Sequence, residues 1–263
     1  MTTHTEYEYA LLSEAAYADF WDERLGQVIT IGNRVKTALT TSGFSNTQAE
    51  AFITQWRVIS HQPNTGNGFS ATVFESIEHP GEFVFAMRGT EPTAQWGTDI
   101  TLADIADIGA DGIALNQAID LINYYQRLTT SGTDMAVQYD VYEGIMPPPP
   151  GTTEYQVSNL LGVPYYRYVK VADPVQGLGV IPDTVGTIDI AGHSLGGHLA
   201  LILSRFDPNR VDDVHTYNAP GFDTGIIGSD DTEWFSGRWR KRRRMKLERP
   251  PSAVFRYHAS VIW

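Results

Sequence analysis

The stretch TIDIAGHSLGGHLALILSRF, residues 187–206, decides the fold. It predicts a short apolar strand over residues 187–191, a tight turn flanked by glycines, and a helix that begins near Gly197. The stretch VHTYNAPGF, residues 214–222, predicts a second strand. Because a strand, a helix and a strand in this order form a βαβ unit, the sequence predicts a parallel sheet.

The turn in this stretch, Gly192-His193-Ser194-Leu195-Gly196, matches the pattern G-x-S-x-G. A serine hydroxyl that attacks a carbonyl group must protrude from a sharp strand-to-helix turn, and flanking glycines let the neighbouring backbones pass closely. The N–H of Leu195 can then donate to the developing oxyanion, supported by the positive end of the helix. Since a strand and a helix flank the motif, we predict that Ser194 is a catalytic nucleophile and Leu195 an oxyanion-hole donor. A chance Gly/Ser turn is the alternative.

A second oxyanion donor is predicted on an earlier loop. Two strand-like runs, residues 68–77 and 82–90, are separated by His79-Pro80-Gly81, a strong turn signal, and form a predicted hairpin that feeds a central strand. Thr90 lies at the C-terminal end of the second run, where α/β sheets place ligands. Its backbone N–H and hydroxyl suit it to complete the oxyanion hole. The alternative is a Gly-Thr turn whose hydroxyl is satisfied locally.

The remaining chain fits a single α/β domain over residues 1–236. Apolar residues recur at helical spacing over residues 6–21, 46–56 and 114–128. Residues 129–185 are rich in Gly and Thr and contain four consecutive prolines, so we expect an irregular insertion, either a lid or a plain surface loop. The expected architecture is a mostly parallel central sheet with helices on both faces.

Composition excludes several classes of site and of protein. The chain of 263 residues has no cysteine, which excludes disulfides, thiolate catalysis and Cys-ligated metal. Its 42% hydrophobic and 19% charged residues are typical of a globular chain. No stretch approaches the roughly 18 apolar residues of a membrane span. The N-terminus lacks the basic and apolar regions of a signal peptide, so we expect a cytoplasmic protein or one exported by another route.

The net charge of −12 is unevenly distributed. Residues 238–263 hold nine of the 19 basic residues and one of the 31 acidic residues, which gives +8 there and leaves −20 before it. The acidic body should not attract nucleic acid. A basic run can bind nucleic acid or anionic lipid. The simpler interpretation is that the chain is cut short or frame-shifted after about Ser236, which predicts a poorly ordered basic tail over residues 237–263.

Three segments together resemble one family. They are GHSLGGHLA (192–200), FVFAMRGTEP (83–92) followed by WGTDI (96–100), and YNAPGF (217–222). They resemble the lipase class 3 family of fungal-lipase-type α/β-hydrolases, especially its bacterial members, over residues 6–225. The resemblance implies an α/β-hydrolase fold, hydrolysis of triacylglycerols or related esters without a cofactor, and an oxyanion hole made from Thr90 and Leu195. It also implies a lipid or other ester as partner, with contact to a lipid interface; no motif calls for a metal.

The base and the acid that should activate Ser194 are not evident. In α/β-hydrolases an Asp or Glu and then a His follow the serine in the chain. Chain order favours structural roles for His198 and His215 and leaves His258 as a weak candidate base, while His193 should support the turn. The acids downstream have no distinguishing context; they are Asp223, Asp230, Asp231, Glu233 and Glu248. Alternatives to a lipase are therefore a phospholipase A1, a short-chain esterase, or a catalytically impaired remnant that binds lipid or another partner.

Overall fold

The computed structural model describes residues 4–89, 114–150, 152, 156–220 and 257–260. The chain divides into two compact units. The main unit comprises residues 1–114 and 184–263, and the inserted unit comprises residues 115–183.

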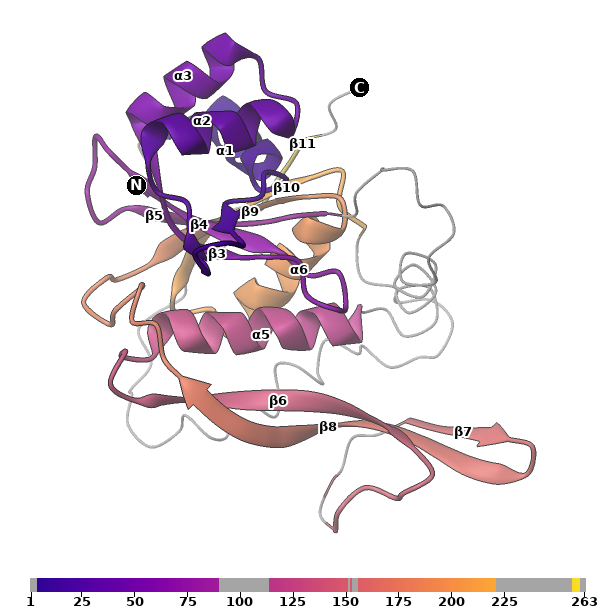
Figure 1. The fold of residues 1–263 in the computed structure, drawn as a ribbon. Helices are drawn as coiled ribbons and strands as arrows, with labels where there is room; N and C mark the ends of the chain where they lie inside the picture. The colour runs from indigo at the N-terminus through magenta and orange to yellow at the C-terminus, as the bar shows by residue number, and fades with distance from the viewer. Residues whose placement is uncertain (1–3, 90–113, 151, 153–155, 221–256, 261–263) are drawn as a thin grey trace. The chain divides into compact units, whose positions relative to one another are not determined.

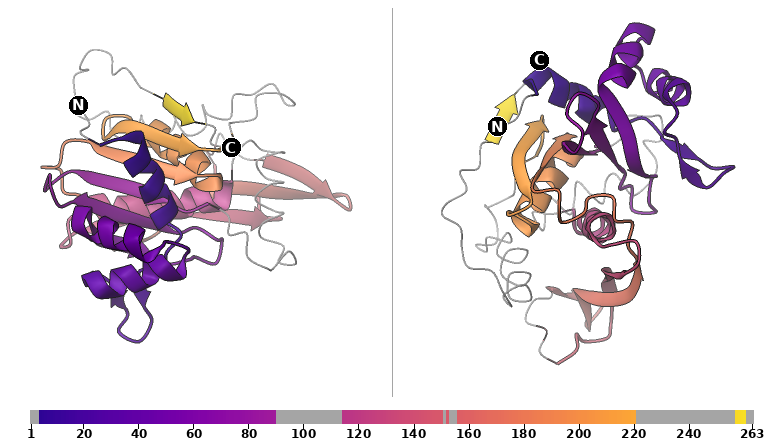
Figure 2. Two further views of the ribbon diagram at one scale, coloured as in Figure 1. Left: turned by 90° about the horizontal axis from the view of Figure 1, so that it is seen from above. Right: turned by 90° about the vertical axis from the view of Figure 1, so that its left-hand side faces the viewer.

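The described part of the main unit is built on a six-stranded sheet with the order β11-β10-β9-β5-β4-β3 (Figure 1, Figure 2). The strands are β3 (Trp56–Gln62), β4 (Ala71–Ser76), β5 (Phe83–Met87), β9 (Ile188–His193), β10 (Val211–Tyr217) and β11 (Tyr257–Ser260). Pairing is parallel from β11 through β10 and β9 to β5, and antiparallel from β5 through β4 to β3. The predicted parallel unit is therefore confirmed, with α6 (Leu195–Phe206) connecting β9 to β10.

The predicted hairpin is also confirmed, because β4 and β5 pair in antiparallel fashion. Its turn is closed by a hydrogen bond of 3.0 Å from the N–H of Glu82 to the carbonyl oxygen of His79. Gly81 has a φ of +94°, which a residue with a side chain rarely adopts, so glycine is required at this point of the turn.

Helices cover both faces of this sheet. Side chains alternate between the faces of a strand, and in β9 Asp189 and His193 contact Tyr9 and Tyr17, which lie in or just after α1 (Glu6–Ala15). Gly192 faces the opposite side of the sheet, since a Cβ built on it would meet the first turn of α6. Helix α1 therefore lies on one face and α6 on the other, as Figure 1 shows.

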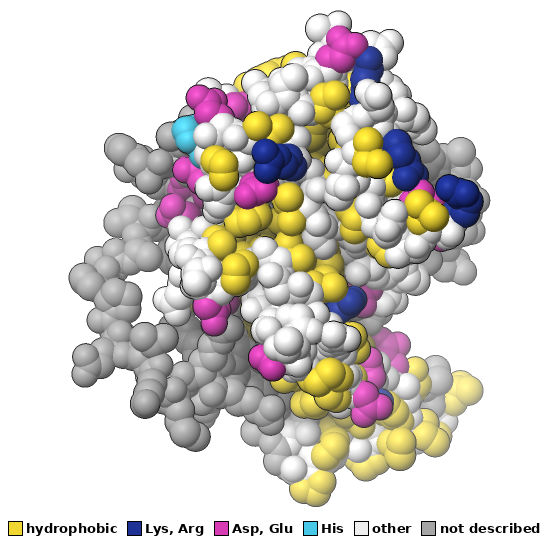
Figure 3. All heavy atoms as spheres, turned by 60° about the vertical axis from the view of Figure 1, so that its left-hand side comes forward, with side chains coloured by type: hydrophobic (Ala, Val, Ile, Leu, Met, Phe, Trp, Pro, Cys, Tyr) yellow, Lys and Arg dark blue, Asp and Glu magenta, His cyan; other side chains and the backbone are white. Residues whose placement is uncertain are grey.

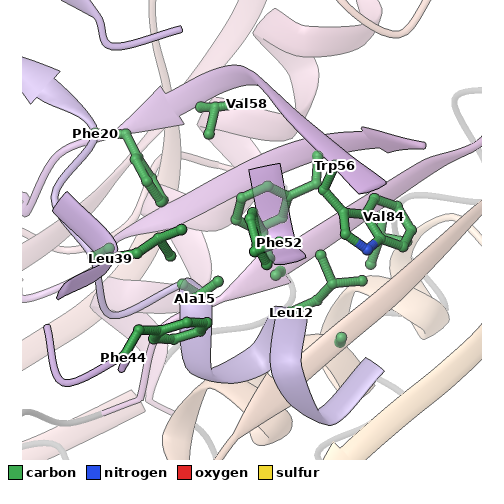
Figure 4. Close-up of a cluster of buried hydrophobic side chains, with 14 of the residues drawn as sticks. Leu12, Ala15, Phe20, Leu39, Phe44, Phe52, Trp56, Val58 and Val84 are labelled. Carbon is green, nitrogen blue, oxygen red and sulfur yellow. The ribbon is translucent and has the colours of Figure 1, made fainter. Parts of the chain in front are cut away.

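A hydrophobic cluster fills the space between α1, the next two helices and the sheet. Helices α2 (Gly32–Thr41) and α3 (Asn46–Gln55) contribute to it, and α1 and α3 each begin with a capping box. In α3 the Ser45 hydroxyl accepts from the N–H of Gln48 at 3.2 Å, while the Gln48 side chain accepts from the N–H of Ser45 at 3.0 Å. Figure 4 shows the packed side chains, which include Leu12, Phe20, Leu39, Phe44, Phe52, Trp56, Val58 and Val84.

The first helix ends earlier than its sequence pattern predicts. The apolar spacing predicts a helix to Trp21, whereas α1 ends at Ala15 and Trp21–Asp22 forms β1, paired with β2 (Gln27–Val28). The Asp19 side chain accepts from the N–H of Trp21 at 3.0 Å, and Asp22 accepts from the N–H of Arg24 at 3.0 Å. Such local side-chain bonds compete with the helix, so the chain turns there.

The inserted unit contradicts the expectation of an irregular segment. Helix α5 (Leu115–Thr129) precedes a three-stranded antiparallel sheet of order β6-β8-β7, with β6 (Met135–Gly144), β7 (Gln156–Leu160) and β8 (Val163–Gln176). Alternating Val and Tyr residues in these strands favour a pleated surface, and this signal outweighs the glycines and the proline run, which lies between β6 and β7. Asn123 joins α5 to β6 through bonds of 2.8 Å to both the N–H and the carbonyl oxygen of Tyr139.

None of the helices in the described part of the chain is both long and apolar enough to span a bilayer.

A buried carboxyl group joins α1 to the sheet. The Tyr9 hydroxyl donates to one oxygen of Asp189, and the N–H of Asp213 donates to the other at 3.2 Å. Burial is the largest influence on Asp189 and raises its pKa from 3.8 to about 6, although the Tyr9 hydrogen bond acts in the opposite direction. The carboxylate is therefore held in a place that favours its protonated form.

This raised pKa predicts that the main unit loses stability as pH rises from about 4 to about 6. In that window the folded state retains a proton that the unfolded state has released, so the free energy of unfolding falls with rising pH. The expected loss is roughly 3 kcal/mol, at ~1.4 kcal/mol per pKa unit. Urea unfolding at several pH values should show this difference between the wild type and Asp189→Asn.

The exposed Glu14 on α1 provides a control, because it is not among the groups that raise the pKa of Asp189. The unfolding curves of Glu14→Gln should run parallel to those of the wild type. Parallel curves for the wild type and Asp189→Asn would contradict the assignment of this pH dependence to Asp189.

Candidate active site

Ser194 occupies a strained turn between β9 and α6. Its backbone has φ 54° and ψ −126°, a region that residues with a side chain rarely enter. The N–H of Ser194 donates to the carbonyl oxygen of Tyr217 at 2.8 Å, and its own carbonyl oxygen accepts from the N–H of Gly197 at 2.9 Å. Strand β10 and helix α6 therefore hold both ends of the residue and maintain the strain.

The glycines on either side of Ser194 permit this turn. A Cβ built on Gly192 would overlap the backbone of Gly196, and one built on Gly196 would overlap the carbonyl group of Met87 at the end of β5. Both obstacles are backbone atoms, which cannot rotate away as a flexible side chain can. The two glycines of the G-x-S-x-G pattern are thus required by the close approach of β9, β5 and α6.

Leu195 is the first residue of α6, as an oxyanion donor requires. The first N–H groups of a helix have no acceptor within the helix, and the helix dipole makes this end positive. The N–H of Leu195 therefore belongs to a helix end that favours a developing negative charge immediately after Ser194.

The loop after β5 reaches the same turn. Gly89 is buried, and a Cβ built on it would lie 3.2 Å from the Cβ of Ser194. The described part of this loop therefore borders Ser194. Thr90 is the next residue and lies outside the described residues, so its role in the oxyanion hole stays a prediction.

His193 supports the turn from the α1 side of the sheet, as the sequence suggests. Its Nδ1 lies 2.9 Å from the hydroxyl oxygen of Tyr17. A Cβ on Gly89 would also meet this hydroxyl, which places Tyr17 beside the loop after β5. Sequence reasoning missed Tyr17, because no local pattern connects it to a partner 176 residues away.

His198 and His215 are engaged in structural contacts. His198 lies in α6, with Nδ1 3.3 Å from the carbonyl oxygen of Pro220, and burial lowers its pKa from 6.5 to about 4. The His215 ring stacks on Tyr9 with ring centroids 3.5 Å apart, and its Nδ1 lies 3.4 Å from the Glu6 carboxylate. Both rings are buried, in keeping with the structural roles predicted for them.

His258 lies in β11, in register with His215, which is in turn in register with Ala191. The backbone of His258 is therefore two strands to the side of β9 and level with a residue three positions before Ser194. At about 4.8 Å per strand and 3.3 Å per residue, each displacement is about 10 Å. This backbone position is distant from the turn, whereas a catalytic base must reach the serine hydroxyl.

The activating base and acid stay unassigned. No side chain in the described ranges hydrogen-bonds the Ser194 hydroxyl. The candidate acids Asp223, Asp230, Asp231, Glu233 and Glu248 lie outside these ranges, as does the basic segment apart from Tyr257–Ser260. Among the described side chains, no cluster of three or more His, Asp or Glu residues is placed to hold a metal ion.

Comparison with known proteins gives a distant structural neighbour. No protein-family model matches the chain, and no curated protein matches it. Among solved structures, the crystal structure of M37 lipase aligns with 98% of this chain and 68% of its own, with 13% sequence identity and a TM-score of 0.34. Similarity at this level decides neither the family nor the activity.

The strain at Ser194 predicts an inverted order of stability for two substitutions. Ser194→Gly and Ser194→Ala both remove the hydroxyl, but only Gly relieves a strain of about 1–3 kcal/mol. Its extra freedom in the unfolded state costs about 0.5–1 kcal/mol. The Gly variant should therefore be more stable than the Ala variant by about 1 kcal/mol in urea unfolding.

Ser204 in the interior of α6 is the matched control. There alanine is preferred to glycine, as in other helices, so the free energy of unfolding of Ser204→Ala should exceed that of Ser204→Gly by about 1 kcal/mol. The same order at both positions would show that Ser194 is not strained.

The close approach at Gly192 predicts a large cost for a single methyl group. Gly192→Ala places its Cβ against the backbone of α6, so the turn must open, and we expect a loss of about 2–4 kcal/mol in the free energy of unfolding. Gly186 lies in the loop before β9, where an added Cβ would meet open space. Gly186→Ala should therefore change the free energy of unfolding by less than about 0.5 kcal/mol. Thermal or urea unfolding measures both; equal effects would argue against the close approach.

Proposed function

We propose that this protein is a serine-dependent carboxylic ester hydrolase with an α/β-hydrolase fold, acting on lipid esters of the triacylglycerol type. The observation that carries the proposal is the backbone of Ser194. A non-glycine residue with φ 54° and ψ −126°, between a parallel strand and a helix N-terminus, is the geometry that exposes a serine nucleophile. The glycines around it maintain that geometry.

The proposed reaction is acyl transfer to water. The Ser194 oxygen attacks the ester carbonyl carbon, and the negative charge that develops on the carbonyl oxygen is stabilised by the N–H of Leu195 and by Thr90. The alcohol leaves as the carbonyl group re-forms, which gives an acyl-enzyme that water hydrolyses. The serine proton passes to a base that the described residues do not identify.

The lipid preference rests on the resemblance of three segments to lipase class 3 enzymes, and a phospholipase A1 or a short-chain esterase would use the same site. A fourth candidate is a catalytically impaired remnant that binds lipid. It rests on the change to a basic composition after about Ser236, which indicates that the chain is cut short or frame-shifted there.

Hydrolysis of p-nitrophenyl butyrate and p-nitrophenyl palmitate tests these candidates. Ser194→Ala should lower kcat/KM on the preferred ester by roughly 10³-fold or more, because the nucleophile is lost. Ser204→Ala removes a hydroxyl from the same helix, where it bonds the carbonyl oxygen of Leu201, and should leave turnover within about twofold. Faster turnover of palmitate supports the lipase, and faster turnover of butyrate supports the esterase.

Two further outcomes are decisive. Equal hydrolysis by the wild type and Ser194→Ala, with no labelling of Ser194 by a fluorophosphonate probe, would establish the remnant. A loss in His258→Gln comparable with that in Ser194→Ala, with an unchanged unfolding midpoint, would identify His258 as the base.

A further inference from the structure

The inserted unit ends in a hairpin with an unusual turn. Strands β7 and β8 are paired up to Leu160 and Val163, so Leu161 and Gly162 alone form the connection (Figure 1). Their φ angles are 52° and 86°, both positive, as in a type I′ turn. The Asn159 side chain accepts from the N–H of Gly162 at 2.7 Å and stabilises the turn.

Leu161 does not suit this turn. Positive φ at the first turn position favours Asn, Asp or Gly, whereas leucine is strained there. Its side chain is 98% exposed, so packing does not compensate for the strain. Asn159 and Gly162 already provide what the turn requires. A residue that breaks a local rule without a structural gain points to a function for its side chain.

The surroundings of Leu161 are apolar and uncharged. Val163 directly follows the turn and is 48% exposed, and Val157, which is in register with Tyr166, is 54% exposed. Among the described residues, every exposed large hydrophobic side chain except Tyr7, Leu25 and Ile31 lies between Met135 and Leu178. No residue from 156 to 166 carries a charge, although the chain as a whole carries −12. Figure 3 shows hydrophobic side chains gathered toward its lower right, on the part of the molecule that contains β7 and β8.

Polarity changes along the outer part of the hairpin, from the turn to Lys170; farther along the chain, Val171, Val175 and Leu178 are again exposed. The aliphatic turn is followed by the half-buried Tyr165 and Tyr166. Beyond them, Arg167 pairs with Glu143 at 2.8 Å, and Lys170 lies 4.0 Å from Asp140.

This order matches the sequence of environments across a lipid–water interface, from acyl chains through the headgroup layer to water. Leu161 and Val163 are two residues apart, which corresponds to about 7 Å along a strand and fits the 5–10 Å depth to which interfacial segments insert. A protein partner would instead be matched by an apolar centre with a polar rim on all sides.

We propose that the β7–β8 hairpin docks this protein on the surface of an uncharged lipid phase, with the Leu161 side chain inserted among the acyl chains. The neutral tip makes no use of anionic headgroups, and the acidic body is repelled by them. The proposal goes beyond ester hydrolysis and does not depend on Ser194, since docking can be measured without turnover.

Two matched substitutions test the docking surface. Leu161→Asn gives the turn a residue that its φ angle favours, so folding should be preserved or improved. Ile31 is 65% exposed in the main unit and is the N-cap of α2, without a capping side-chain bond. Ile31→Asn is therefore the control, because it also replaces an exposed aliphatic residue with one that the local backbone prefers.

Binding to phosphatidylcholine vesicles is measured by co-sedimentation, with Ser194→Ala as the common background so that hydrolysis cannot alter the lipid. Leu161→Asn should lower the partition coefficient about tenfold or more, the effect of returning one leucine side chain to water. Ile31→Asn should leave it unchanged.

Four outcomes would overturn the proposal. They are equal vesicle binding by all three proteins, no vesicle binding by the background protein, equal losses in the two Asn variants, and binding that requires phosphatidylglycerol and disappears in salt. The last would assign binding to the basic segment after residue 237. Self-association that is abolished by Leu161→Asn, without vesicle binding, would instead make the hairpin an interface between two copies of this chain.

Discussion

The contact of the first turn of α6 with the ends of β5 and β9 is the constraint on which the candidate site depends. At Gly192 and Gly196 the backbones approach so closely that no side chain fits between them. Ser194 is therefore forced into a backbone region that serine avoids. The same contact brings the loop after β5 to the serine, so one packing arrangement places Ser194, the N-terminus of α6 and the described end of that loop together.

Two buried titratable groups lie on the sheet that carries this contact and on the helix beside it. Their contributions to stability change with pH in opposite directions. Asp189 under α1 has a raised pKa, so its contribution weakens as pH rises toward 6. His198 in α6 has a lowered pKa, so its contribution weakens as pH falls from 6.5 toward 4. In both cases burial disfavours the charged form. The packing of α1 on the sheet is thus weakened by rising pH, whereas the packing of α6 is weakened by falling pH.

The sequence predicts the sharp turn at Ser194, the β4–β5 hairpin and the parallel βαβ unit, because each depends on residues close together in the chain. The G-x-S-x-G glycines and the His79–Gly81 turn are local signals of this kind. The sequence does not predict the inserted sheet, because the glycines and prolines of this segment indicate irregular structure and mask the alternation of Val and Tyr in β6 and β8. Tyr17 could not be found, since its contact with His193 arises only when the chain is folded.

The strain at Ser194 has a consequence for how the chain changes over generations. A serine in this conformation lowers stability, and a single substitution by glycine would relieve it. Selection on folding alone would therefore favour glycine at this position, and drift would do nothing to restore the serine. On the proposed function, selection for the hydroxyl itself maintains the serine against this preference.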